Sequence, residues 1–135
     1  MKELQKRILS GVTALGMLGS AFGVWYFDPS NESFFPICPL FSLTGFACPG
    51  CGMTRAMHSL VHGDVYTAID YNILSPIVFI LLFVIFTSLS LKAIRGSGLA
   101  YRPPTLRVQS AIFIAVMVFG IVRNIPAYPF TFLFP

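Results

Sequence analysis

Three long apolar stretches, at about 8–27, 75–95 and 106–122, constrain the fold of this chain more than any other feature. An α-helix rises about 1.5 Å per residue, so about 20 apolar residues cross the roughly 30 Å hydrocarbon layer of a membrane. The composition agrees, because 56% of the residues are hydrophobic and only 10% are charged, against about 25% charged residues in soluble domains. We therefore predict an all-α membrane protein with three transmembrane helices, in which residues 1–135 form a single polytopic domain.

The first stretch also has features of a signal peptide, since it follows basic residues at the amino terminus. Two observations favour a membrane span instead. The stretch is longer than the apolar core of a cleaved signal, which is roughly 7–15 residues long. It also ends in Trp25, Tyr26 and Phe27, and aromatic residues are typical of the membrane–water interface.

Basic residues near the ends of the stretches predict their orientation, because Lys and Arg are enriched in cytoplasmic loops. Seven of the nine lie before the first stretch or between the second and third: Lys2, Lys6, Arg7, Lys92, Arg95, Arg102 and Arg107. The other two are Arg55 and Arg123. We therefore predict a cytoplasmic amino terminus, with residues 28–74 and the carboxyl terminus extracytoplasmic. The basic residues behind the formal charge of +4 then set the orientation in the membrane, and no nucleic acid partner is expected.

The region between the first two stretches is predicted to be an ordered loop over residues 28–53, followed by one or two short interfacial helices at about 54–71. Thr54 and Asp64 are suitable N-cap residues for these helices. The carboxyl-terminal tail, residues 128–135, is too short to cross a membrane and is expected to lie along the interface.

Reactive side chains gather in residues 45–64, between apolar flanks. This segment contains Cys48, Cys51, Arg55, His58, His62 and Asp64, and the third cysteine, Cys38, lies ten residues before Cys48. A chain this apolar rarely keeps such groups together unless they lie at a polar surface or take part in binding or catalysis. We therefore place the candidate site here.

The run from Cys38 to Ala56, with the later Gly-Asp, Tyr-Asn and Arg-Asn-Ile-Pro segments, resembles a bacterial family of small membrane proteins of unknown function. The similarity extends over about residues 35–126, and its most specific part is a Cys-Pro-x-Cys-Gly-x-Thr-Arg motif. The positions that match the pattern are Cys38, Thr44, Gly45, Cys48, Pro49, Cys51, Gly52, Thr54, Arg55, Gly63, Asp64 and Asn72. The resemblance implies a bacterial cytoplasmic (inner) membrane location but no established activity.

The three cysteines allow three kinds of chemistry. In a membrane thiol–disulfide oxidoreductase, Cys48 would be the nucleophile and Cys51 the resolving thiol, since a helix N-terminus stabilises a thiolate. In an oxidising compartment, a Cys48–Cys51 or Cys38–Cys48 disulfide could instead hold the loop rigid. Alternatively, Cys38, Cys48 and Cys51 with His58 or His62 form a Cys₃His set that suits zinc.

The two arginines on the predicted extracytoplasmic side suggest a binding site. Arg55, Asp64, Asn72, Arg123 and Asn124 share this face, and guanidinium groups bind carboxylates and phosphates bidentately. We expect Arg55 and Arg123 to meet at one site, although interfacial arginines also commonly close helix ends. No other catalytic motif is present. The sequence thus favours an accessory or interaction protein that binds another membrane protein or an anionic lipid head group, with the oxidoreductase as the alternative.

The orientation can be tested with a membrane-impermeant maleimide applied to intact cells after reduction. We expect the reagent to label Cys38, Cys48 or Cys51, because all three lie between residues 28 and 74. Labelling that requires cell lysis would contradict the predicted orientation, provided that a detergent control shows the thiols to be accessible.

Overall fold

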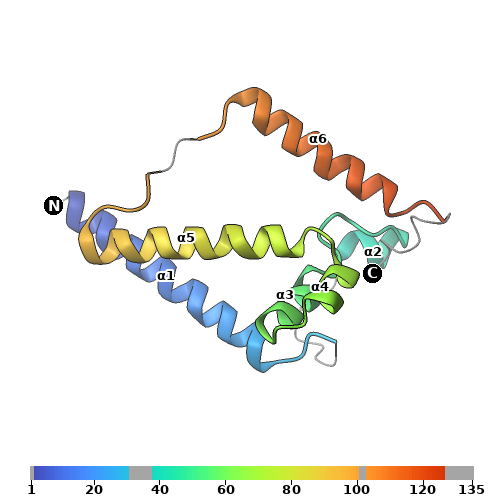
Figure 1. Cartoon of the computed structure of the whole chain (residues 1–135), viewed down its shortest axis with the longest axis horizontal. Helices are drawn as coiled ribbons and strands as arrows, with labels where there is room; N and C mark the ends of the chain where they lie inside the picture. Colours follow the sequence, from blue (N-terminus) through green and yellow to red (C-terminus); the bar gives the residue numbers. More distant parts are fainter. Residues whose placement is uncertain (1, 31–37, 101–102, 127–135) are drawn as a thin grey trace.

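The computed structural model of this chain describes residues 2–30, 38–100 and 103–126, and all regular structure within these ranges is helical (Figure 1). The helices are α1 (Lys2–Tyr26), α2 (Pro39–Thr44), α3 (Met53–Val61), α4 (Val65–Tyr71), α5 (Ser75–Arg95) and α6 (Leu106–Val122). The predicted all-α fold is confirmed. The tail at 128–135, for which we predict an interfacial position, lies outside the described residues.

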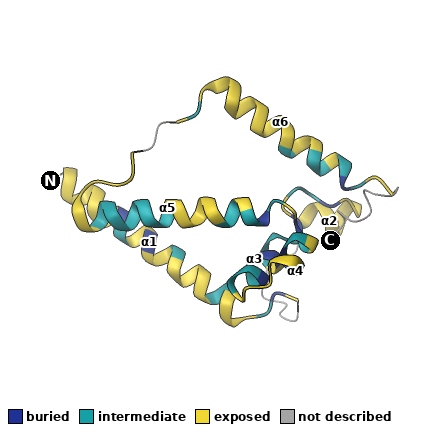
Figure 2. Ribbon diagram, viewed as in Figure 1, coloured by how far each residue is buried: buried dark blue, intermediate teal, exposed yellow. Residues whose placement is uncertain are grey.

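Two helices, α1 and α5, are long and apolar enough to cross a membrane, which indicates a membrane protein. α6 has 17 residues, or about 25 Å at 1.5 Å per residue, so a third transmembrane span stays a prediction. Most side chains of α1 and α6 are exposed, and those of α5 are exposed or intermediate with the exception of Ser75 (Figure 2). Apolar side chains on the outside of long helices are expected where lipid surrounds the protein.

The boundaries of α5 and α6 agree with the predicted stretches, whereas α1 begins at Lys2, six residues before the predicted start. This early turn contains a Lys6–Glu3 ion pair at 2.7 Å. Arg7 then extends to the end of α5, where Nε donates to the carbonyl of Ala93 at 3.1 Å and Nη2 to that of Ile94 at 2.6 Å. These bonds satisfy carbonyls that a helix end leaves without partners.

The predicted loop at 28–53 contains one helix that the sequence analysis did not anticipate, the six-residue α2. Pro39 occupies its first turn, where the fixed φ of proline suits a helix and the missing N–H costs nothing. Gly45 ends it with φ of 73°, a left-handed conformation that glycine adopts without steric cost.

The predicted helical region at 54–71 is present as two helices, α3 and α4. Asp64 caps α4 as expected, because its carboxylate accepts a hydrogen bond from the N–H of Thr67 at 3.0 Å. Thr54 does not cap α3, which begins one residue earlier with Gly52 at the N-cap. Ser75, the first residue of α5, donates its hydroxyl to the carbonyl of Ala68 at 3.1 Å and so joins α5 to α4.

The helices form two groups that meet at one end of the molecule. α1 packs against the end of α5 near its own amino terminus and then diverges from it toward α3, and α3 and α4 pack together at the start of α5 (Figure 1). α6 stands apart from α5 along most of its length and reaches the rest of the chain at its carboxyl end (Figure 1). There, a Cβ atom added to Gly120 would lie only 2.7 Å from Cγ of Pro49. The close approach of α6 to the cysteine-containing segment therefore requires glycine at this position.

Candidate functional site

Arg123 follows α6 directly and is completely buried. Its Nη1 donates to the carbonyl oxygens of Cys48 at 3.0 Å and Cys51 at 3.2 Å, and lies 3.5 Å from that of Pro49. The guanidinium group also lies over the ring of Phe119, 5.3 Å from its centre. Arg123 thus binds the backbone of residues 47–52, which we call the thiol loop.

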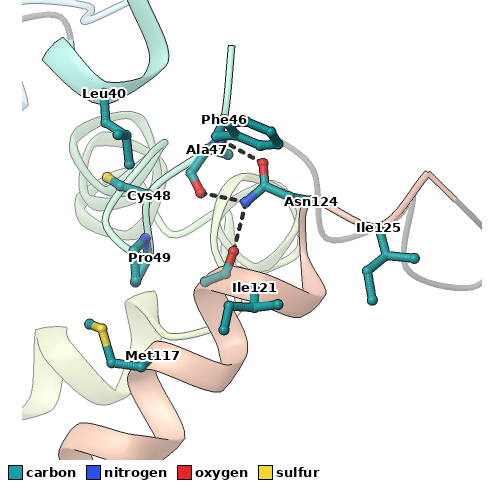
Figure 3. Close-up of a pocket in the computed structure, with 10 residues that line it drawn as sticks. Leu40, Phe46, Ala47, Cys48, Pro49, Met117, Ile121, Asn124 and Ile125 are labelled. Carbon is teal, nitrogen blue, oxygen red and sulfur yellow. Dashed lines mark hydrogen bonds between the residues drawn. The ribbon is translucent and has the colours of Figure 1, made fainter. Parts of the chain in front are cut away.

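Two asparagines bind the same loop from different helices. Asn72, which is buried at the end of α4, donates to the carbonyls of Pro49 at 2.9 Å and Cys51 at 3.1 Å. Asn124 accepts from the N–H of Ala47 at 2.7 Å and donates to its carbonyl at 2.8 Å (Figure 3). Buried backbone groups need such partners, so the helix ends hold the thiol loop in one conformation.

The loop brings all three thiols together, which we call the three-thiol cluster (Cys38, Cys48 and Cys51). The sulfur of Cys48 lies 3.3 Å from that of Cys38 and 3.3 Å from that of Cys51, and all three sulfurs lie within 4.8 Å of one another. A disulfide is about 2.05 Å long, so all three are free thiols. The structural disulfide considered for Cys48–Cys51 or Cys38–Cys48 is not confirmed.

The environments of the outer two thiols differ. The pKa of Cys38 is lowered to about 7, chiefly because the backbone N–H of Phe41 in the first turn of α2 stabilises the thiolate, helped by the thiols of Cys48 and Cys51. The pKa of Cys51 is raised to about 12, chiefly by burial and then by its hydrogen bonds to the other two thiols. Near neutral pH, Cys38 therefore supplies the thiolate and Cys51 keeps its proton.

Both histidines lie away from this cluster, between α3 and α1. His58 Nδ1 donates to the carbonyl of Val24 at 2.6 Å, and the His62 ring stacks on Trp25 with centroids 6.2 Å apart. Within the described residues, the group of potential metal ligands at this site contains the three cysteines and neither histidine. The predicted Cys₃His set is thus reduced to three sulfur ligands.

The five residues predicted to bind an anion or a partner have different surroundings. Arg123, Asn72 and Asn124 contact the thiol loop. Asp64 is exposed and caps α4, and hydrogen bonds from the hydroxyl and N–H of Thr67 lower the pKa of its carboxyl. Arg55 is also exposed, and its guanidinium makes no hydrogen bond or ion pair with the described residues. The expected meeting of Arg55 and Arg123 is not seen there, and the anion-binding role stays a prediction.

An open apolar groove of about 560 Å³ lies beside the cluster, between the thiol loop and the end of α6. Leu40 of α2 and Met117 of α6 lie at opposite ends of one side, with Cys48 and Pro49 between them (Figure 3). Other lining residues are Phe46, Ala47, Gly120, Ile121, Asn124 and Ile125. The sequence analysis missed this groove, because its walls come from segments that are about 70 residues apart.

Comparison with known proteins identifies one similar family. Residues 38–86 match a family described as "Protein of unknown function (DUF2752)". No curated protein and no solved structure matches the chain. The matched segment contains the three-thiol cluster and Asn72 and ends before α6. Arg123 therefore lies outside it, and so do the groove residues that α6 and the segment after it contribute.

The role of Arg123 can be tested by thermal unfolding of the purified protein in detergent. Arg123→Ala leaves carbonyls of the thiol loop without a donor, and each such buried group costs about 1–3 kcal/mol. We expect a lower melting temperature, by several degrees, and faster alkylation of Cys51.

Arg55→Ala is the matched control, because it removes the same charge from an exposed position and should change stability by less than about 0.5 kcal/mol. Equal melting temperatures for the two variants would show that Arg123 does not hold the thiol loop.

Proposed function

We propose that this chain is a membrane accessory protein that exchanges disulfides with a partner protein through the three-thiol cluster. The observation that carries this proposal is the central position of Cys48, whose sulfur lies 3.3 Å from both other sulfurs. Either disulfide forms if the sulfurs approach by about a further 1.3 Å, since the bond length is about 2.05 Å. Cys48 can therefore pair with Cys38 or with Cys51 without a change of fold.

The exchange step follows from the central position of Cys48, whose sulfur lies 3.3 Å from each of the other two. When Cys48 and Cys51 are joined, the Cys38 thiolate attacks the sulfur of Cys48, the Cys38–Cys48 bond forms and the Cys48–Cys51 bond breaks. Cys51 leaves with the electron pair and takes up a proton from water. The N–H of Phe41, the chief cause of the lowered pKa of Cys38, is independent of the other two thiols and supports Cys38 as the attacking group, because nucleophilic thiols work best with a pKa near the ambient pH.

A partner protein completes the reaction. A thiolate of the partner attacks the disulfide of the cluster and forms a mixed disulfide, which the partner's second thiolate then resolves. The partner loses two electrons and two protons and gains a disulfide, while two cysteines of the cluster become thiols. The hydrogen bonds of Arg123, Asn72 and Asn124 to the backbone of the thiol loop support this role, because they hold Cys48 and Cys51 in place during both steps.

Site-resolved alkylation of the reduced protein tests the assignment of the nucleophile. A lowered pKa means that the thiolate persists to lower pH, so we expect the alkylation rate of Cys38 to reach half its maximum near pH 7 and to level off about one pH unit higher. Cys51 should react slowly up to much higher pH. Peptide mass spectrometry after timed quenching gives the rate for each cysteine.

Glutathione redox buffers then test the exchange itself. Wild-type protein should contain both Cys38–Cys48 and Cys48–Cys51 disulfides over a range of potentials, and Cys48→Ser should contain neither. Cys38→Ser is the matched control and should keep the Cys48–Cys51 pair. One unchanging disulfide at every potential would instead support a structural bridge.

A second candidate function, binding of a soft metal ion, is favoured by the shape of the sulfur triangle. Two sides are 3.3 Å and the third is at most 4.8 Å, so the point equidistant from all three sulfurs lies within about 2.4 Å of each, close to the Zn–S distance of about 2.3 Å. Thiolates suit zinc and monovalent copper.

Elemental analysis of protein purified without chelator distinguishes this candidate. Bound zinc or copper should amount to about one equivalent, and Cys51→Ser should lose it. His62→Ala should retain it, because His62 stacks on Trp25. Metal-free protein with oxidised thiols would exclude metal binding.

A further inference from the structure

We propose that the apolar groove beside Cys48 binds the ring of a lipid-soluble quinone, which accepts the electrons when two thiols of the cluster are oxidised. This inference rests on the proposed thiol exchange and names the acceptor that restores the disulfide. Three observations support it: the residues that line the groove, the position of the groove on α6, and the presence of Cys48 among the lining residues.

The lining favours an uncharged, apolar molecule. Leu40, Phe46, Met117 and Ile121 contribute apolar side chains. The amide of Asn124, a polar group in the wall, hydrogen-bonds to Ala47 and to the carbonyl of Gly120 at 2.6 Å. No charged side chain lines the described groove, so an anion or a charged peptide would find no counter-charge. Its volume of about 560 Å³ lies within the roughly 300–1,000 Å³ of small-molecule sites.

The position on α6 gives a membrane-dissolved molecule access. Met117, Gly120 and Ile121 belong to the last turns of this apolar helix. Side chains on the preceding turns, such as Phe113 and Ile114, are exposed. If α6 lies in the bilayer, the groove continues an apolar surface that lipid covers, and a lipid-soluble acceptor enters it without crossing water.

The placement of Cys48 identifies the occupant as an electron acceptor. Of the three clustered cysteines, Cys48 alone is among the residues that line the groove, and the sulfurs of Cys38 and Cys51 each lie 3.3 Å from its sulfur. A molecule in the groove therefore contacts Cys48, and the Cys38 thiolate is in place to attack the sulfur of Cys48. A lipid acyl chain would fill the same space but would make no use of this arrangement.

The reaction balances with a quinone. The Cys48 thiolate adds to a ring carbon and forms a C–S bond. The second thiolate, from Cys38, attacks the Cys48 sulfur, so the S–S bond forms and the C–S bond breaks with its electron pair remaining on the ring. The thiols lose two protons in all, and the ring oxygens take up two. One dithiol becomes a disulfide and one quinone becomes a hydroquinone.

The test is anaerobic mixing of the reduced, full-length protein in nanodiscs with decylubiquinone or with a fully substituted naphthoquinone. We expect one hydroquinone for every two thiols lost, measured by ultraviolet absorbance and by thiol counting. Met117→Trp, which fills the groove, should slow oxidation about tenfold or more. Ile112→Trp is the matched control on α6, outside the groove lining, and should leave the rate unchanged. Cys48→Ser should abolish the reaction.

Glutathione disulfide, a water-soluble oxidant, separates this inference from the proposed function. We expect it to oxidise the wild-type and Met117→Trp proteins at similar rates. Oxidation by glutathione disulfide but by neither quinone would overturn the quinone site and leave thiol exchange standing. Equal quinone rates for Met117→Trp and Ile112→Trp would also overturn it and would fit a groove filled by acyl chains. Oxidation by none of the three would overturn both proposals.

Discussion

Arg123 places a positive charge where water cannot reach it, and the backbone carbonyls of the thiol loop solvate that charge instead. Burying an isolated cation costs several kcal/mol, so a conformation that turns these carbonyls away from Arg123 is strongly disfavoured. The bonds from Nη1 to Cys48 and Cys51 therefore connect the end of α6 to a segment more than 70 residues earlier. The rest of the site depends on this connection.

The carbonyl contacts have a consequence for the sulfurs. A Cys-x-x-Cys turn in a free loop samples many conformations, and a third cysteine ten residues away has no reason to stay close. Here Asn72 and Asn124 bind further backbone groups of the thiol loop, so its shape is set from two helix ends. Because the loop is held, Cys38 at the start of α2 meets Cys48 at 3.3 Å. Polar bonds to the backbone thus hold Cys48 and Cys51 in place, and hydrogen bonds between the sulfurs join the three thiols.

The contact between α6 and the thiol loop also makes the groove. Gly120 lets the helix approach Pro49 closely. The neighbouring side chains of α6 line the groove together with Cys48. A helix with the length and apolarity of a short membrane span is therefore in direct contact with the thiol loop.

The apolar stretches by themselves determined the all-α architecture and the bounds of α5 and α6, because the length of an apolar run and the glycine after Arg95 are local properties. The cap at Asp64 was equally predictable, and residues 45–64 could be recognised as part of the candidate site from composition alone. The sequence could not decide which side chains are used for structure, since that depends on contacts between distant segments. Only the tertiary structure buried Arg123 against the thiol loop, left Arg55 exposed and stacked His62 on Trp25. Spacing along the chain says nothing about such partners, because the energy of burying a charge is decided by the groups that surround it in space.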